Sequence, residues 1–159
     1  MAYPPGFSYV AGPYRIQDFT VTSADTFCKR NPVTLTTAGT ISQFSAPALN
    51  IVGIALSDSS QSIGGKVPVL LIDEETIFAS KLQTGVASSA LTDCVAMNIE
   101  LATEHFRPDP DSTLTLVVQL VPRGDGSADA ASADSSVFCR FLPNILKFQS
   151  GGTVIVPAI

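Results

Sequence analysis

The chain consists of short apolar runs of strand length that alternate with polar turns. Val, Ile, Thr and Leu dominate these runs, and short β-branched runs favour strands over helices. Gly, Pro, Asn and Ser gather between the runs and predict turns. Because no helical pattern separates the runs, the sequence predicts an all-β fold, a single-domain β-sandwich or small barrel. The predicted strand segments are residues 19–27, 32–41, 51–56, 66–72, 113–122, 137–142, 144–150 and 153–159.

Prolines qualify two of these predictions. Pro68 lies inside the run 66–72, and because proline has no amide hydrogen for a sheet, this run is predicted to be an edge strand or to carry a bulge. Pro108 and Pro110 predict a rigid turn after a strand end.

Two segments are harder to assign. Within residues 82–104, the apolar positions Leu91, Val95 and Ile99 are spaced by four, which would suit a short helix. The surrounding β pattern favours a strand instead. Residues 122–136 are polar, small and glycine-bearing, so they are predicted to form a long flexible loop within the domain.

The two ends of the sequence differ from the β domain at 16–150. Residues 1–15 are predicted to form an extended N-terminal arm, and residues 151–159 a C-terminal strand or tail. Prolines prevent a helix in the arm, yet four of its side chains are aromatic. Exposed rings are unfavourable in a free segment, so the arm is expected to lie against its own domain or a neighbouring subunit.

A low content of charged residues indicates that little of the surface is devoted to solvation. Charged residues make up 14% of the chain and hydrophobic residues 45%, whereas about a quarter of an average protein is charged. Either the fold buries much of itself or a partner covers part of it.

The net charge of −5 argues against nucleic-acid binding, which needs clustered Lys and Arg. No run approaches the roughly 20 apolar residues of a membrane-spanning helix, and the N-terminus lacks a signal-peptide pattern. Synthesis in the cytoplasm, without a membrane partner, is therefore expected.

The acidic trio Asp73, Glu74 and Glu75 is the first candidate for chemistry. On a strand, Asp73 and Glu75 would share one side and form a possible cation site, but neither calcium-loop spacing nor a nearby histidine accompanies them. A solvated turn explains the trio better. His105 is the single histidine, so any catalytic triad or Cys–His pair would have to use it, and no nucleophile motif surrounds it.

The remaining motifs favour no chemistry. Cys28, Cys94 and Cys139 are odd in number and far apart, so they predict small buried apolar residues, not a disulfide framework or zinc site. The Arg-Gly-Asp tripeptide at 123–125 matches an integrin-binding signal, but so short a match arises readily by chance. The glycines before Lys66 lack the spacing of a phosphate-binding loop. We therefore expect no catalytic residue, metal ligand or cofactor, and no enzyme.

The stretch NIVGIALSDSSQSIGGKVPVLLIDEETIFAS, residues 50–80, resembles a signature of small bacteriophage head-decoration proteins, also called structural cement proteins. In that family a "VVGVAL" strand leads through a short loop to a "GK-V-x-V" strand and an acidic turn that closes on "T-x-F". The preceding residues are similar to the family's opening strand, so the resemblance covers residues 17–80, about half of the chain. The matching positions are Val52 to Leu56, Gly65 to Leu71, Asp73, Thr76 and Phe78.

The resemblance implies a virion protein that binds the outer surface of an assembled capsid. Its partners would be the major capsid protein and itself, as a trimer or dimer, and it would strengthen the shell against internal DNA pressure. Such a protein needs apolar area and strand edges that can pair with neighbours. Residues 50–80 would then form a strand–loop–strand unit of the core, and the termini and long loops would bind partners.

The residues predicted to contact partners therefore lie in the two termini. They are Tyr3, Phe7, Tyr9, Tyr14, Val154, Ile155, Val156 and Ile159. Trimming residues 1–15 or 151–159 is expected to leave the β domain folded but to abolish capsid binding. Two other functions stay open: a carbohydrate- or host-binding β module of a virion fibre, and a metal-dependent hydrolase that uses Asp73, Glu75 and His105.

Overall fold

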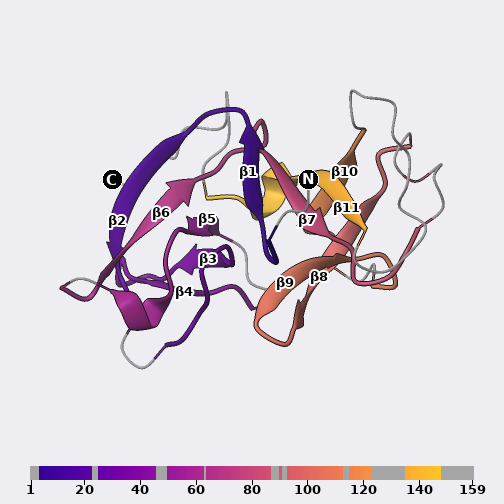
Figure 1. Cartoon of the computed structure of the whole chain (residues 1–159). Coiled ribbons are helices and arrows are strands. Elements are labelled where there is room, and N and C mark those ends of the chain that lie inside the picture. The colour runs from indigo at the N-terminus through magenta and orange to yellow at the C-terminus, as the bar shows by residue number, and fades with distance from the viewer. Residues whose placement is uncertain are drawn as a thin grey trace.

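The protein is a sandwich of two antiparallel β-sheets. The computed structural model describes residues 4–22, 25–45, 50–62, 64–86, 90, 93–112, 115–122 and 135–147. Figure 1 shows the two sheets next to each other, with the strands of the N-terminal half mostly on one side and those of the C-terminal half on the other. The predicted all-β sandwich is confirmed, and it does not close into a barrel.

The six-stranded sheet has the order β1-β7-β11-β10-β8-β9, and all its neighbouring strands are antiparallel. The first strand of the chain therefore lies at one edge of this sheet, beside β7, and β9 lies at the other edge. Its strands are β1 (Ser8–Ala11), β7 (Ile77–Lys81), β8 (Ala96–Ala102), β9 (His105–Asp109), β10 (Val118–Val121) and β11 (Ser136–Phe141).

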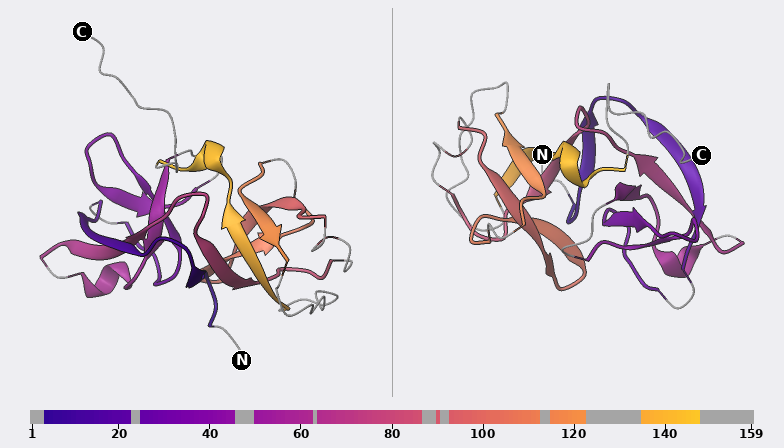
Figure 2. Two further views of the ribbon diagram at one scale, coloured as in Figure 1. Left: turned by 90° about the horizontal axis from the view of Figure 1, so that it is seen from above. Right: turned by 180° about the vertical axis from the view of Figure 1, so that it is seen from behind.

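The five-stranded sheet has the order β2-β6-β5-β3-β4 and is also antiparallel throughout. A bridge between Val21 and Ile41 joins the ends of the edge strands β2 and β4, so this sheet is strongly curled (Figure 2). Its strands are β2 (Arg15–Thr20), β3 (Pro32–Leu35), β4 (Ile41–Gln43), β5 (Ile51–Ala55) and β6 (Lys66–Leu71). Single-turn 3₁₀ helices, η1 (Ser59–Gln61) and η2 (Pro143–Ile145), follow β5 and β11.

The curled sheet has a hydrophobic core on each of its faces. All five residues of β5 are buried, because Ile51 and Ile54 point into the main core while Val52 and Ala55 point into a second core. A run that is apolar at every position suits a strand covered on both faces. Large members of the main core include Phe7, Leu70, Phe78, Leu120 and Phe141. The second core comprises Phe27, Val33, Ile41, Val52, Ala55, Val67 and Val69.

Gly53 lets β5 pack closely against β6. An added Cβ at Gly53 would lie 2.1 Å from the Leu70 carbonyl oxygen and 2.6 Å from Val69 Cγ1. These separations are far below van der Waals contact, so any larger residue would push the two strands apart. The glycine of the IVGIAL run is therefore required by packing.

The prediction that Pro68 marks an edge or a bulge is wrong. β6 lies between β2 and β5, and its pairing with β2 is regular through Pro68. The Pro68 carbonyl accepts a hydrogen bond from the Leu56 amide at 2.9 Å, so the main chain of Pro68 points towards β5. Since β5 ends at Ala55, the missing amide hydrogen falls at the end of the β5–β6 ladder, where its loss is tolerated.

Several predicted boundaries also change. Pro108 lies within β9 and pairs with Ile99 of β8; the turn comes later, at Pro110. β8 confirms a strand in the second part of residues 82–104. The described part of the predicted strand 19–27 contains only the end of β2 and an isolated bridge at Val21. The predicted strand 113–122 is shortened to β10, and the described part of 144–150 has only an isolated bridge at Leu146, beside the helix η2.

The predicted N-terminal arm is part of the domain. β1 pairs with β7, and the ring of Phe7 is 1% exposed, in contact with the rings of Phe78 and Phe141. The Phe7 amide donates to the Arg30 carbonyl at 2.9 Å, and Arg30 Nε donates to the Pro5 carbonyl at 2.7 Å. Removing residues 1–15 would therefore remove β1 and part of the core, so the structure gives a reason to expect that the trimmed domain is destabilised.

Candidate functional site

Three large apolar side chains are exposed where the chain passes from one sheet to the other. Tyr9 in β1, Tyr14 in the connection and Ile16 in β2 are 36%, 57% and 50% exposed. We call these three residues the N-terminal surface. β1 and β2 are both edge strands, so this surface lies beside strand edges of both sheets.

The two tyrosines hold each other in place. Their ring centroids are 4.9 Å apart in an edge-to-face arrangement, and the Tyr9 hydroxyl donates to the Gly12 carbonyl at 2.5 Å. Gly12 has φ +101°, and a Cβ there would lie 2.6 Å from the Glu75 carbonyl oxygen. The connection is therefore fixed against the turn before β7, and rings that are ordered beforehand lose little entropy on binding.

Ile16 extends the main-core face of the curled sheet beyond the region that the other sheet covers. It pairs with Leu70 of β6, and directly paired residues point to the same face of a sheet. Leu70 is buried in the main core, at 1% exposed, while Ile16 is half exposed. A partner that covered Ile16 would continue the core outwards.

The acidic trio is only partly the solvated turn that the sequence predicts. Asp73 is buried, and its Oδ1 accepts hydrogen bonds from the Glu75 amide at 2.9 Å and from Thr76 Oγ1 at 3.3 Å. Its Oδ2 lies 3.5 Å from Arg15 Nη2. An aspartate side chain that accepts a hydrogen bond from the amide two residues ahead stabilises a turn, so Asp73 has a structural role. Of the trio, Glu74 is half-buried and only Glu75 is exposed.

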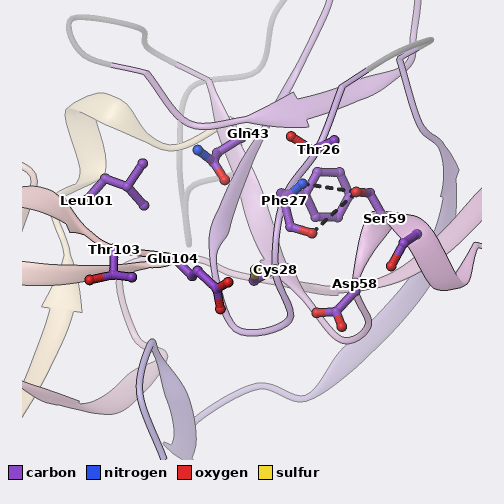
Figure 3. A pocket seen from close by; sticks show the side chains of 10 residues that line it. Thr26, Phe27, Cys28, Gln43, Asp58, Ser59, Leu101, Thr103 and Glu104 are labelled. Atoms are coloured by element: carbon purple, nitrogen blue, oxygen red, sulfur yellow. Dashed lines mark hydrogen bonds between the residues drawn. The ribbon is translucent and has the colours of Figure 1, made fainter.

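A second candidate site is a hollow of about 470 Å³ between loops of the two sheets. In Figure 3, Cys28 lies between the carboxylates of Glu104 and Asp58. The size is within the range of small-molecule pockets, and the lining mixes apolar and polar side chains with two carboxylates, without a lysine or arginine. The lining residues are Thr26, Phe27, Cys28, Gln43, Asp58, Ser59, Ser60, Leu101, Thr103 and Glu104.

The electrostatics of this hollow work against a thiolate nucleophile. Burial raises the pKa of the Cys28 thiol, and the carboxylates of Glu104 and Asp58 raise it further. Burial also lowers the pKa of the His105 imidazole, as does the charge of Arg30. A thiol with a raised pKa lacks the thiolate character that a catalytic cysteine needs.

The described part of the structure does not bring together a metal site of the kind that the metal-dependent hydrolase hypothesis needs. Asp73, Glu75 and His105 all lie in the described part of the chain, and no three His, Cys, Asp or Glu side chains there are grouped so that they could hold a metal ion.

The three cysteines are free thiols, and Cys139 alone is fully buried. Burial raises the pKa of Cys139 to about 12.

The structure separates the predicted contact residues. Tyr9 and Tyr14 are exposed, whereas Phe7 belongs to the core and is not available to a partner. Tyr3, Val154, Ile155, Val156 and Ile159 lie outside the described residues, as do the Arg-Gly-Asp tripeptide and most of the loop 122–136. The sequence interpretation missed Ile16, which the alternation of β2 would have shown as an isolated apolar residue between Arg15 and Gln17.

Comparison with known proteins adds no family. No protein-family model matches the chain, and no curated protein sequence matches it. None of the helices in the described ranges is long and apolar enough to cross a membrane.

Proposed function

We propose that this protein is a capsid decoration protein, which binds the outer surface of a phage head and stabilises the shell. The observation that carries the proposal is the N-terminal surface: Tyr9, Tyr14 and Ile16 are exposed together beside two strand edges. Large apolar side chains gathered at one place on a surface are typical of protein interfaces. Its function on this view is assembly, without a catalytic step.

The residues that resemble decoration proteins form one continuous piece of structure, which supports the proposal. β5 and β6 pair as an antiparallel unit. The acidic turn then passes through Asp73 and Thr76 into β7, where Phe78 enters the main core. The same turn contacts Gly12 and Arg15. In this proposal the motif supports the N-terminal surface from behind and does not bind the shell itself.

A surface of this kind is adequate for a decoration protein because many copies bind one shell. Permanent interfaces bury on the order of 2,000 Å² or more with an apolar centre. The ordered tyrosine pair provides aromatic anchors for such a centre. Repetition over a lattice adds avidity, so each individual contact can be weak.

Co-sedimentation with phage shells that lack this chain tests the proposal. Wild-type protein should sediment with the shells at a saturating, fixed ratio. The double variant Tyr9→Ser/Tyr14→Ser should bind at least about tenfold more weakly, since hot-spot aromatics contribute about 2 kcal/mol or more. Leu116→Ser is the matched control, because Leu116 is 41% exposed and precedes β10, three strands away from β1. If wild-type protein stays in the supernatant, or both variants lose binding alike, the proposal is wrong.

A further inference from the structure

Within the described ranges, the two sheets together have four edge strands, and three of them are protected against pairing with another chain. The edges are β1 and β9 in one sheet and β2 and β4 in the other. The register of β1 shifts between Tyr9 and Ala11, as in a β-bulge. Bulges and caps are common means by which proteins block unwanted pairing at sheet edges.

Side chains and loops cap the other two protected edges. Along β9, the Phe106 amide donates to Asn31 Oδ1 at 3.1 Å, and the Pro108 carbonyl accepts from the Gln83 amide at 2.9 Å. Along β4, the Ile41 carbonyl accepts from the Thr22 amide at 2.9 Å, and the Gln43 amide donates to Asp25 Oδ2 at 2.9 Å.

β2 has no such protection over its first half. The Leu56–Pro68 and Ile72–Val52 hydrogen bonds show that the even-numbered residues of β6 point towards β5. Its odd-numbered residues therefore bond β2, and they pair with Arg15, Gln17 and Phe19. The amides and carbonyls of Ile16 and Asp18 consequently point outwards, and no described residue bonds them there.

We propose that this free edge of β2 pairs antiparallel with β2 of a second copy, which makes a symmetric dimer with one continuous sheet across the interface. Both copies supply outward donors and acceptors at the same spacing, as a two-fold interface requires.

The side chains of β2 select one register. With the two-fold axis at Ile16, the two half-exposed Ile16 side chains face each other, and Tyr14 faces Asp18 of the second copy. With the axis at Gln17, each Ile16 would face a carboxylate. With the axis at Asp18, two carboxylates would face each other, which is destabilising. The dimer therefore has its axis at Ile16, where exposed apolar surface is buried on both sides.

Light scattering on the purified protein tests the dimer. The dimer uses Ile16 of the N-terminal surface and leaves the Tyr9–Tyr14 pair for the shell, and light scattering without shells reports on the dimer alone. The mass should rise with concentration towards twice the 16.6 kDa monomer mass. Ile16→Lys should raise the dimer dissociation constant at least about tenfold with unchanged circular dichroism, while Ile16→Val and Leu116→Lys should not. A wild-type protein that stays monomeric at every concentration, or an Ile16→Lys variant that dimerises normally, overturns the proposal.

Cysteine cross-linking tests the register. In a background of Cys28→Ser and Cys94→Ser, single cysteines are placed at 16, 17 or 18 and oxidised. Directly opposed, hydrogen-bonded residues have Cα atoms about 5.5 Å apart, which suits a disulfide, whereas Cα atoms more than about 7 Å apart cannot be bridged. Ile16→Cys should form covalent dimers, and Gln17→Cys and Asp18→Cys should not. A cross-link at 17 or 18 without one at 16 contradicts the register.

Discussion

Asn31 joins the two sheets, and replacing it offers a quantitative test of the fold. It lies just before β3, is fully buried, and reaches the β8–β9 hairpin of the other sheet. Its Oδ1 accepts from the Phe106 amide at 3.1 Å, and its Nδ2 donates to the Glu104 carbonyl at 2.8 Å. A weaker contact from Nδ2 to Gln43 Oε1 measures 3.4 Å.

Asn31→Ala should lower the free energy of unfolding by about 2–4 kcal/mol. The Phe106 amide is buried, and a buried donor without a partner costs about 1–3 kcal/mol. The Glu104 carbonyl belongs to an exposed residue, so losing its hydrogen bond costs only about 1 kcal/mol. For a domain of this size such a loss lowers the melting temperature by about 4–16 °C.

Urea unfolding followed by far-ultraviolet circular dichroism measures this loss. The control is Thr37→Ala, in the exposed turn between β3 and β4, which should change the free energy of unfolding by less than about 0.5 kcal/mol. The two variants should have the same m-value. If Asn31→Ala costs no more than the control, the side chain does not join the sheets as described.

Three further predictions concern other parts of the fold. Gly53→Ala should destabilise the protein by at least about 3 kcal/mol, measured by the same unfolding assay, because its Cβ would lie 2.1 Å from the Leu70 carbonyl oxygen; a neutral result would contradict the close packing of β5 and β6. Phe7→Ala should lower the free energy of unfolding by about 3–5 kcal/mol in this assay, because its ring packs against Phe78 and Phe141; a freely extended arm would predict no loss. Burial lowers the pKa of His105 from its ordinary value of 6.5. The unfolded chain therefore binds the proton more readily, and stability should fall as the pH drops below about 6.5. Unfolding free energies between about pH 7 and pH 5.5 should depend less on pH in His105→Gln, and an equal slope in both proteins would exclude this assignment.

The local pattern of the sequence was enough to predict the fold class and several strands. The runs 51–56 and 66–72 became β5 and β6 because uninterrupted apolar runs suit strands with two buried faces. The turn around Gly39 became the β3–β4 hairpin. In these places the information lies within a few neighbouring residues.

Properties that depend on distant residues were not predictable in this way. Pro68 was predicted at an edge because proline lacks a donor, but the end of β5 at Ala55 decides whether that donor is needed. Asp73 was predicted to be solvated, yet Arg15 and the Gly12 region cover its turn. Phe7 belongs to the core because β7 and β11 place Phe78 and Phe141 beside it.

The candidate site was predictable only in part for the same reason. The aromatic character of residues 1–15 pointed to Tyr9 and Tyr14. It did not show that these rings are exposed while Phe7 is buried, because that difference depends on β1 pairing with β7. Ile16 is half exposed on the edge strand β2, although its partner Leu70 is buried. The sequence of β2 alone does not show that this strand lies at an edge.

The most direct test of the proposed function is an electron-microscopic reconstruction of mature phage particles assembled in the presence of this protein, labelled with an antibody against it. If the protein decorates the shell, label and additional density should appear at regular lattice positions on the outer surface of the head. Mature particles that carry neither would contradict the proposed function.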